Sequence, residues 1–559
     1  MMKFDRILSS FAILFGAFAI LRADTQVTEY KTNIGGNWFS PTTWNVLPSA
    51  NVSYPNSFSD AFCMEGSDTV VVLDSDATVG RMIGGGGAFS GNKVVGSGKL
   101  TFDSHYDSTN SYDYSASALW GNGDITYENT GGVHYTTSDD KSSGWSDTVG
   151  VKIFFAKNTN THTQTYNTSV SADVVTSMNG TSAEKSVINF NSSTSLTDFY
   201  VTNGTVNFNG SSSFGTVTAN ATGVVNVSGS VLSGSFAGTG TINITGDYTK
   251  ADGASANIGT IITKSSAAVN FNHAGQIATG YQYYENSGKV LVSENAIVKI
   301  SENAAAGDSW GSKFLVQIGG SSFYTLNGTL DATNYNGDSN AQIIRNWGNF
   351  IINQTGVLKG SGNTSSFLYM GRESNFTVNG DAKIEGVSYI YLNQTVKTSS
   401  TVYINDSNTL ADIYLVANKD KSNNDGTTDD TLTNTNVFLS GDVAIKSLNF
   451  YQKNNQFTID LRDCTSLVLE TLFTDSNANA NGGKIIFTNF KNGIVYIENT
   501  SGLDIDNFSD YVLAEGWELS IEDGYIVGSQ IPEPCVFAFI LSFAGLLLAL
   551  RNRNNGMLS

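Results

Sequence analysis

Ile188-Asn189-Phe190-Asn191, Val206-Asn207-Phe208-Asn209, Val225-Asn226-Val227-Ser228 and Ile242-Asn243-Ile244-Thr245 are four copies of one short pattern. In each copy apolar residues flank one asparagine, and these asparagines lie 18, 19 and 17 positions apart. An alternation of period two is typical of a strand that buries one face. A Gly or Ser follows each copy and suits a bend. The pattern therefore predicts a strand that returns after each short stretch of chain.

A spacing of 17 to 19 residues between equivalent strands matches one turn of a β-solenoid. In such a fold the equivalent strands of successive coils stack in parallel. A single coil cannot bury its own apolar face, so its stability would come from its neighbours. We therefore predict an all-β protein whose body is a right-handed parallel β-helix. A set of β-sandwiches is the alternative, because their strands also recur at short, regular intervals.

The repeat continues beyond the first four copies. A looser copy lies at Val269–Asn272, and echoes follow at Thr325–Gly328, Phe376–Gly380 and Val402–Asp406. Asparagines at matched positions predict a row, inside the body or on its surface, in which each side-chain amide bonds the next.

The composition agrees with short strands joined by polar turns. Hydrophobic residues reach 40%, Gly is abundant at 57, Pro is scarce at 5, and only 14% of residues are charged. Disorder would require low hydrophobicity as well as polarity. The net charge of -20 argues against a nucleic-acid partner, because a phosphate backbone would be repelled.

The segment Gly35-Gly36-Asn37-Trp38, followed by Trp44, opens the body. It resembles the opening of many bacterial surface proteins with autotransporter-type β-strand repeats. The two indole rings suit a cap over the open end of an apolar column. A pair of rings that stacks on sugars is the alternative.

The body is expected to fall into three parts. Residues 24–103 would form the N-terminal cap and first coils. Residues 104–180, richer in Ser, Tyr, Asp and Thr, would form irregular coils or a lateral insertion. Residues 181–530 would hold the β-solenoid repeats and a C-terminal cap, where Asp523-Gly524 predicts a hairpin.

Residues 1–23 are interpreted as a signal peptide. Lys3 and Arg6 precede the mostly apolar run Ile7–Leu21, and the small residue Ala23 suits the cleavage position. An uncleaved N-terminal anchor is the alternative. The chain is therefore expected to be exported to the cell envelope, the cell surface or the medium.

A second signal is predicted at residues 531–555. The apolar run Cys535–Leu550 predicts a single C-terminal transmembrane helix, with Arg551 and Arg553 as its basic flank on the cytoplasmic side. Pro532-Glu533-Pro534 stands immediately before this run. The prolines cannot extend the helix backwards, so they would hold an extended recognition peptide.

This tail resembles the PEP-CTERM sorting signal of Gram-negative bacteria, with Pro532, Glu533 and Pro534 as the motif. The resemblance implies recognition by exosortase, a membrane-embedded cysteine transpeptidase-like enzyme, and then release or transfer to the cell surface or extracellular matrix. Two features depart from the family pattern. The basic end has only two arginines, and Cys535 stands where Ser, Thr or Ala is common. A plain C-terminal anchor is the alternative.

No motif supports a catalytic, cofactor or metal site. The four histidines, His105, His134, His162 and His273, lack zinc-like spacing and are predicted to lie on the surface. The run Gly84–Gly87 lacks the Gly-Lys-Ser/Thr of a phosphate loop.

Two further groups are candidate sites. Asp425, Asp429 and Asp430 miss the ligand spacing of an EF-type calcium loop, so a solvated loop is expected there. Cys63 and Cys464 make no metal cluster, and their separation leaves a disulfide open.

The sequence therefore predicts an exported structural or adhesive protein that is not an enzyme. Its exposed Asn, Ser and Thr suit contact with extracellular polysaccharide. The main alternative is a β-helical polysaccharide lyase or hydrolase, which would need paired carboxylates or a calcium ion with arginine. An autotransporter passenger fits less well, because the tail resembles a helix and not the strands of an outer-membrane barrel.

Overall fold

The computed structural model describes residues 28–32, 34–47, 54–56, 60–82, 89–103, 123–137, 151–155, 162–179, 186–220, 222–245, 257–258, 261–263, 268–272, 276–285, 287–300, 304, 306–309, 312–336, 341–361, 367–371, 373–394, 400–419, 433–450, 455–472, 483–531 and 545–548. Within them almost all regular structure is strand, with helix at α3 (Phe508–Tyr511) and at 545–548. The chain divides into two compact units, Met1–Ile258 and Gly259–Ser559. The prediction of an all-β protein is confirmed.

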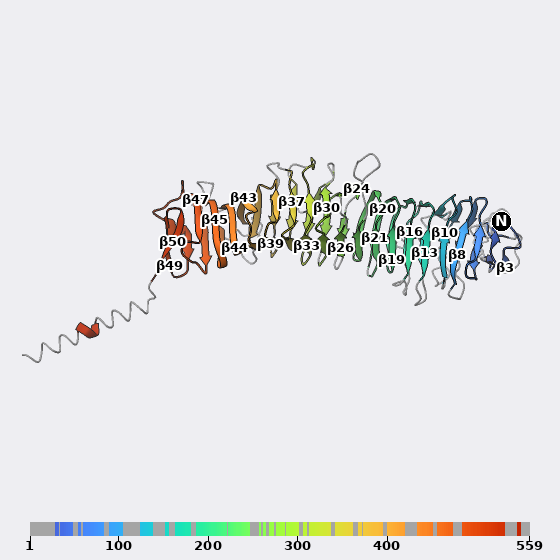
Figure 1. The fold of residues 1–559 in the computed structure, drawn as a ribbon, viewed down its shortest axis with the longest axis horizontal. Helices are drawn as coiled ribbons and strands as arrows, with labels where there is room; N and C mark the ends of the chain where they lie inside the picture. Colours follow the sequence, from blue (N-terminus) through green and yellow to red (C-terminus); the bar gives the residue numbers. More distant parts are fainter. Residues whose placement is uncertain are drawn as a thin grey trace, which may run out of the picture. The chain divides into compact units, whose positions relative to one another are not determined.

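The first unit is built mainly from three ladders of parallel strands (Figure 1). Ladder 1 consists of β2 (Gly36–Asn37), β5 (Val70–Val72), β8 (Phe89–Val95), β10 (Gly123–Tyr127), β13 (Thr163–Tyr166), β16 (Val187–Phe190), β19 (Thr205–Phe208), β21 (Val224–Val227) and β23 (Thr241–Ile244). Ladder 2 consists of β6 (Ala77–Val79), β9 (Leu100–Asp103), β11 (Val133–Thr136), β14 (Val170–Ala172), β17 (Thr194–Ser195), β20 (Ser212–Ala219) and β22 (Val231–Gly238). Ladder 3 consists of β12 (Val151–Phe155), β15 (Thr176–Asn179), β18 (Phe199–Val201), β20 and β22.

The chain visits these ladders in rotation, and each passage is called a circuit below. In the middle of the unit each strand pairs in parallel with the strand three places later, as β13 does with β16 and β14 with β17. Strand β20 is long enough to pair with both β17 and β18. Ladders 2 and 3 therefore merge from β20 onward. The predicted segment 104–180 contains β10 to β15, which take places in the same three ladders.

A small sheet stands at the start of the first unit. Its strand order is β3 (Asn45–Leu47), β1 (Thr28–Thr32), β4 (Asp60–Met64) and β7 (Arg81–Met82). Strand β3 runs antiparallel to β1, whereas β1 pairs in parallel with β4. The unit ends with β24 (Asn257–Ile258).

Strict alternation fixes which side chains face the core. Ile188, Val206, Val225 and Ile242 pair in one register and are buried. The asparagines that follow them in sequence lie on the outer face and are half-buried. The predicted strands and their shared register are confirmed. Neighbouring strands of a β-sandwich are antiparallel, so the parallel ladders rule that alternative out for this part of the chain.

Aromatic side chains stack along the inner face of ladder 1. The ring centroids of Tyr127 and Tyr166 lie 4.8 Å apart, those of Tyr166 and Phe190 5.2 Å apart, and those of Phe190 and Phe208 5.2 Å apart. All four side chains are buried. Each strand therefore covers the ring of the preceding strand, which is how the circuits share one apolar core.

Hydroxyl groups interrupt this core near β11 and β13. The hydroxyls of Tyr135 and Tyr166 form a 2.5 Å hydrogen bond, and the Tyr166 hydroxyl donates to Gln164 Oε1 at 3.3 Å. The Tyr127 hydroxyl donates to the Met82 sulfur at 3.6 Å. Burial raises the pKa of Tyr127, Tyr135 and Tyr166 well above the ordinary value of a tyrosine.

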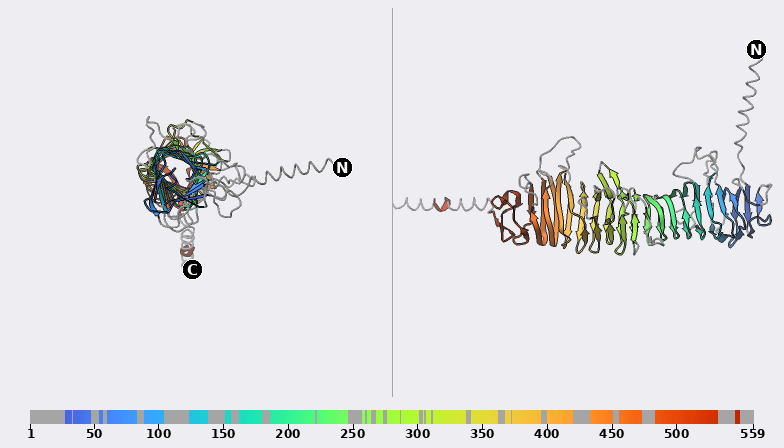
Figure 2. Two further views of the ribbon diagram at one scale, coloured as in Figure 1. Left: turned by 90° about the vertical axis from the view of Figure 1, so that its right-hand side faces the viewer. Right: turned by 90° about the horizontal axis from the view of Figure 1, so that it is seen from above.

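The second unit is also built from stacked strands (Figure 2). Its circuits are longer, since equivalent asparagines lie 26 positions apart and not 18 or 19. Ladder 4 consists of β26 (Ala268–Phe271), β29 (Lys289–Val292), β33 (Phe323–Leu326), β36 (Asn349–Ile352), β39 (Asn375–Asn379), β42 (Thr401–Asn405), β44 (Thr433–Phe450), β45 (Asn455–Leu472), β46 (Lys484–Thr488) and β48 (Val512–Ala514). Ladder 5 consists of β27 (Gln276–Thr279), β30 (Ile297–Ile300), β34 (Thr329–Asp331), β37 (Val357–Lys359) and β40 (Lys383–Glu385). Ladder 6 consists of β25 (Ile261–Thr263), β28 (Gln282–Tyr284), β32 (Ser312–Ile318), β35 (Gln342–Asn346), β38 (Phe367–Met370), β41 (Tyr389–Gln394), β43 (Leu410–Lys419), β44, β45 and β47 (Val495–Asn499).

The looser repeats found in the sequence all fall in ladder 4, where β33, β39 and β42 lie at equivalent positions. Strand β31 (Gly307–Ser309) departs from the pattern by pairing antiparallel with β32. The long strands β44 and β45 each take part in ladders 4 and 6, so these two ladders merge.

An antiparallel hairpin follows the last strand of ladder 4. Strands β49 (Trp517–Glu522) and β50 (Tyr525–Gln530) pair along their whole length. The two linking residues have positive φ, 47° at Asp523 and 85° at Gly524, as a tight type I′ turn requires. The predicted Asp-Gly hairpin is confirmed.

Both terminal signals lie largely outside the described residues. These are the predicted signal peptide 1–23 and nearly all of the tail 531–555, of which Ile531 and 545–548 are described. Residues 545–548 are helical. In the described part of the chain no helix has both the length and the apolar character needed to cross a membrane.

Deletion of residues 207–225 tests whether circuits are interchangeable units. The deletion removes 19 residues, the spacing of Asn207 and Asn226, and joins Val206 to Asn226 in the register of β16. Because each circuit contacts mainly its neighbours, we expect a folded protein whose Tm changes by only a few degrees, ~5 °C or less. Circular dichroism during heating measures this.

Deletion of residues 207–216 is the matched control, because it leaves a circuit too short to reach ladders 2 and 3. We expect its Tm to fall by more than about 10 °C. Equal changes in Tm for the two deletions would contradict the interpretation that circuits are interchangeable units.

The tyrosine hydroxyls predict sensitivity to alkaline pH. Because burial raises their pKa in the folded state, stability is complete below about pH 10 and is lost as the pH rises above it. In Tyr166→Phe one such group is absent, so the free energy of unfolding should fall less steeply between about pH 10 and 12. Urea unfolding across this range measures the slope. The exposed Tyr525 supplies the control, Tyr525→Phe, and an unchanged slope in Tyr166→Phe would refute the prediction.

Candidate functional surface

Asparagine side chains form a hydrogen-bonded row on the outer face of ladder 1. Asn243 Nδ2 donates to Asn226 Oδ1 at 2.8 Å, Asn226 to Asn207 at 2.8 Å, and Asn207 to Asn189 at 2.7 Å. Asn189 Nδ2 donates to Thr165 Oγ1 at 3.3 Å. The row, called row 1, exists because the strands are paired in register, so equivalent asparagines stand on adjacent strands. The predicted amide row is confirmed, and it lies on the surface.

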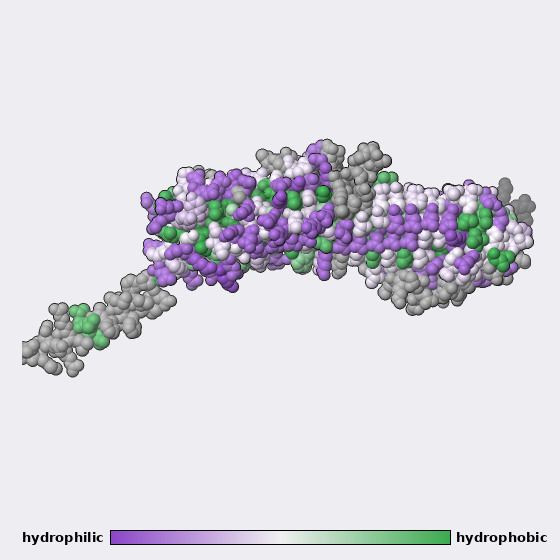
Figure 3. Space-filling view, viewed as in Figure 1, coloured by the Kyte–Doolittle hydropathy of each residue, from purple (hydrophilic) through white to green (hydrophobic). Residues whose placement is uncertain are grey.

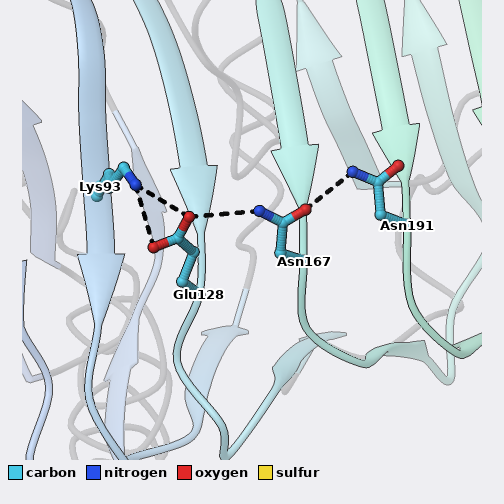
Figure 4. A network of polar contacts seen from close by, with 4 residues as sticks. All are labelled: Lys93, Glu128, Asn167 and Asn191. Atoms are coloured by element: carbon cyan, nitrogen blue, oxygen red, sulfur yellow. Dashed lines mark hydrogen bonds and ion pairs between the residues drawn. The ribbon is translucent and has the colours of Figure 1, made fainter.

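A second row, row 2, follows the bends after the same strands. Ser228 Oγ donates to Asn209 Oδ1 at 2.7 Å, Asn209 to Asn191 at 2.8 Å, and Asn191 to Asn167 at 2.8 Å. Figure 4 shows how this row ends. Asn167 Nδ2 donates to Glu128 Oε1 at 3.3 Å, and Lys93 Nζ lies 3.1 and 3.2 Å from the two Glu128 oxygens.

All these amides donate in one direction, toward the preceding circuit. The donor end of row 2 therefore meets a carboxylate, which accepts, and Lys93 balances the carboxylate charge. The side chains of Lys93 and Glu128 are 43% and 32% exposed, so solvent weakens this ion pair and its contribution to stability is small. Figure 3 shows the result as hydrophilic rows that run across successive strands of the first unit.

The second unit carries two comparable rows on ladder 4. In row 3, Asn405 donates to Asn379 at 2.8 Å, Asn379 to Asn353 at 2.9 Å, and Asn353 to Asn327 at 2.7 Å. In row 4, Asn375 Nδ2 donates to Asn349 Oδ1 at 2.8 Å, and Asn349 Nδ2 to the Ser322 carbonyl at 3.2 Å.

The chemistry that these rows offer is hydrogen bonding without charge. An asparagine amide has two N–H donors and an oxygen with two lone pairs, and the row bonds use one of each at Asn207, Asn353 and Asn379. The remaining donor and acceptor suit ligands with many hydroxyl groups. Amides do not titrate in the physiological range, so the rows themselves supply no general acid or base.

The spacing of rows 3 and 4 was missed in the sequence. Each of the bonds between asparagines described above for these rows joins residues 26 positions apart. A search at this longer period would have found Asn349 and Asn375 as well. The shorter period of the first unit obscured it, because the circuits of the second unit are longer.

The histidines are placed differently from one another. His105 and His273 lie outside the described residues. His134 is half-buried, with Nδ1 2.8 Å from Ser171 Oγ and Nε2 4.0 Å from Asp173 Oδ2. Burial, and then the charge of Lys99, lowers the pKa of His134.

The predicted surface position of His162 is wrong. Its side chain is only 2% exposed, because His162 continues the inward alternation of Gln164 and Tyr166 in β13. Burial lowers its pKa, whereas the charge of Asp124 acts in the opposite direction. In the described residues no group of three or more His, Cys, Asp or Glu side chains could hold a metal ion.

The two tryptophans are core residues. Trp38 is fully buried and packs edge-to-face against Trp44 at 5.2 Å and Phe62 at 5.1 Å. Their indole N–H groups donate to the carbonyls of Pro55 and Trp38 at 2.8 and 2.7 Å. This agrees with a cap at the start of the first unit. A sugar-stacking role is excluded, because neither ring is open to solvent.

Cys63 and Cys464 are buried in different units, and neither forms a disulfide in the described part of the chain. Burial raises the pKa of Cys464 to about 11. This thiol is therefore protonated at neutral pH and unsuited to nucleophilic chemistry.

Other sequence candidates lie outside the described residues. These are the sorting motif Pro532-Glu533-Pro534, the flanking Arg551 and Arg553, the run Gly84–Gly87, and Asp425, Asp429 and Asp430.

Comparison with known proteins identifies no relative. No protein-family model, no curated protein and no solved structure matches the chain.

The substitution Asn207→Asp tests how the amide rows stabilise the fold. At neutral pH the carboxylate would face the Asn189 oxygen without a donor, so we expect a loss of about 1–3 kcal/mol. This environment raises the pKa of the introduced carboxyl above its unfolded value. The lost stability should therefore return as the pH falls below about 4. Urea unfolding at several pH values measures this.

Asn220→Asp is the matched control, because Asn220 lies in a turn outside the rows and is also half-buried. The interpretation fails if both variants lose the same stability at neutral pH, or if Asn207→Asp recovers none at low pH.

Proposed function

We propose that this chain is an exported structural or adhesive protein of the cell surface or extracellular matrix. The observation that carries the proposal is the set of uncharged amide rows along the outer faces of ladders 1 and 4. A rigid surface with many neutral hydrogen-bonding groups suits contact with hydrated extracellular polymers. The same groups are poorly suited to acid–base catalysis.

The finer architecture belongs to the same proposal. We take the three ladders of each unit to be the walls of a right-handed parallel β-helix. The rotation of the chain through parallel ladders supports this form, and connections between parallel strands of one sheet are right-handed in nearly every known case. A helix of this kind presents long, flat and repetitive faces, which suit a scaffold.

Delivery is proposed to depend on the two terminal signals. The signal peptide 1–23 would direct export. The motif Pro532-Glu533-Pro534, the apolar run Cys535–Leu550 and the basic residues Arg551 and Arg553 would then form a PEP-CTERM sorting signal. An exosortase-like enzyme is the proposed processing partner. The apolar run would hold the chain in the membrane, as a single helix, until processing.

The mature C-terminus tests the sorting proposal. In a Gram-negative host that contains exosortase, mass spectrometry of the surface-exposed protein should show loss of everything beyond the Pro532 region. The double variant Pro532→Ala/Pro534→Ala should retain the tail and remain in the membrane fraction, because the extended recognition peptide is lost.

Gln530→Ala, directly before the tail, is the control and should be processed normally. A mature protein that still carries Arg553 would instead indicate a plain C-terminal anchor and would contradict the sorting proposal.

A further inference from the structure

One outer face of the second unit combines two amide rows with exposed aromatic rings. It is formed by the outward positions of five neighbouring strands of ladder 4, namely β33, β36, β39, β42 and β44 (Figure 1). These positions form three columns and are called the neutral face. The first column is Phe323, Asn349, Asn375, Thr401 and Asn436; the central column is Thr325, Ile351, Thr377, Tyr403 and Phe438; the third is Asn327, Asn353, Asn379, Asn405 and Ser440.

None of these outward positions carries a charged side chain, although the whole chain has a net charge of -20. All of them are half-buried or exposed, so they form part of the solvent-facing surface. Charged residues lie at both edges of the face, where Lys289 pairs with Phe323 and Asp460 pairs with Phe438 across the strands. The Asp460 carboxylate accepts from Asn489 Nδ2 at 2.8 Å and lies 3.6 Å from an Arg462 nitrogen, so its charge is partly balanced.

Two aromatic rings stand side by side in the central column. The ring centroids of Tyr403 and Phe438 lie 5.1 Å apart with an interplanar angle of 14°. The two side chains are 39% and 38% exposed, so both rings reach solvent. Both rings therefore keep part of their apolar surface open to a ligand.

Hydrogen-bonding groups flank the rings on both sides. Row 3 runs along the third column and ends at Asn405, beside Tyr403. Row 4 and Thr401 follow the first column. The columns repeat at the spacing of paired strands, about 4.8 Å. The face therefore offers the same donors and acceptors many times in line, beside apolar ring surface.

We propose that the neutral face binds an uncharged polysaccharide, with its chain laid along the columns. Sugar rings have an apolar face, which suits Tyr403 and Phe438, and hydroxyl groups at their edges, which suit the amides of rows 3 and 4. The proposal rests on the proposed function and specifies the polymer class and the surface that contacts it.

The lack of charged side chains in the neutral face favours an uncharged polysaccharide over charged polymers. The three columns hold no cation, and Lys289 and Arg462 lie only at their edges. An acidic polysaccharide or a nucleic acid would therefore gain few ion pairs and would be repelled by an acidic protein. A protein partner is less favoured, because the large exposed rings of the face, Phe323, Tyr403 and Phe438, stand among amides and hydroxyls, whereas protein interfaces have a more apolar core.

Affinity electrophoresis of the full chain tests the proposal. Gels would contain hydroxyethylcellulose, dextran or galactomannan as neutral probes, or polygalacturonate as the acidic probe. We expect at least one neutral probe to retard the protein and polygalacturonate not to. In Tyr403→Ser/Phe438→Ser the Kd for that probe should rise by about tenfold or more, because both stacking surfaces are removed.

Tyr496→Ser/Tyr525→Ser is the matched control, because it also removes a pair of contacting aromatic rings, with centroids 4.8 Å apart and an interplanar angle of 46°, from outside the neutral face. It should bind as the unaltered chain does, and circular dichroism should show that both double variants are folded. If Tyr403→Ser/Phe438→Ser does not fold, Asn379→Asp replaces it, because a charge in row 3 should weaken neutral binding without removing a ring.

Equal binding by the two double variants, retardation by polygalacturonate alone, or no retardation by any neutral probe would overturn the proposal. None of these results would affect the sorting of the chain, which the mature C-terminus reports separately.

Discussion

Parallel pairing of each strand with its equivalent one circuit away is the interaction on which the rest of the structure depends. No circuit can bury its apolar face alone, so Ile188, Val206 and Val225 leave water only because they lie in one register. A slip by one residue would turn these side chains outward and the asparagines inward. Register is therefore the property that the sequence has to specify most strongly.

The amide rows and the aromatic column both specify this register. On the inner side of ladder 1, Tyr166, Phe190 and Phe208 stack ring on ring. On the outer side, Asn189 and Asn207 are bonded across the same strands. Any other register would break both sets of contacts together. A surface of aligned amides is thus a consequence of how the core is assembled, and the same surface is then available to a ligand.

The proposed sorting signals and the proposed ligand-binding surface lie in different parts of this chain. The signals lie in two terminal segments, whereas the surface proposed to contact polysaccharide lies on the strands between them. The strands supply hydrogen-bonding groups and a pair of exposed rings but few charges, and this chemistry suits reversible contact with hydrated polymers more than catalysis. The hairpin of β49 and β50 precedes the tail, so a change in the tail need not disturb the ladders.

The sequence alone determined the strands, their shared register, the existence of a row of Asn189, Asn207, Asn226 and Asn243, and the Asp523-Gly524 turn, because these follow from local alternation and short spacing. The tertiary structure decided the merging of ladders in β20 and β44, the burial of His162 and the meeting of Tyr403 with Phe438. These features depend on the length and path of each circuit. The number of residues in a circuit changes along the chain. A repeat recognised at one spacing therefore does not predict which outward residues become neighbours elsewhere.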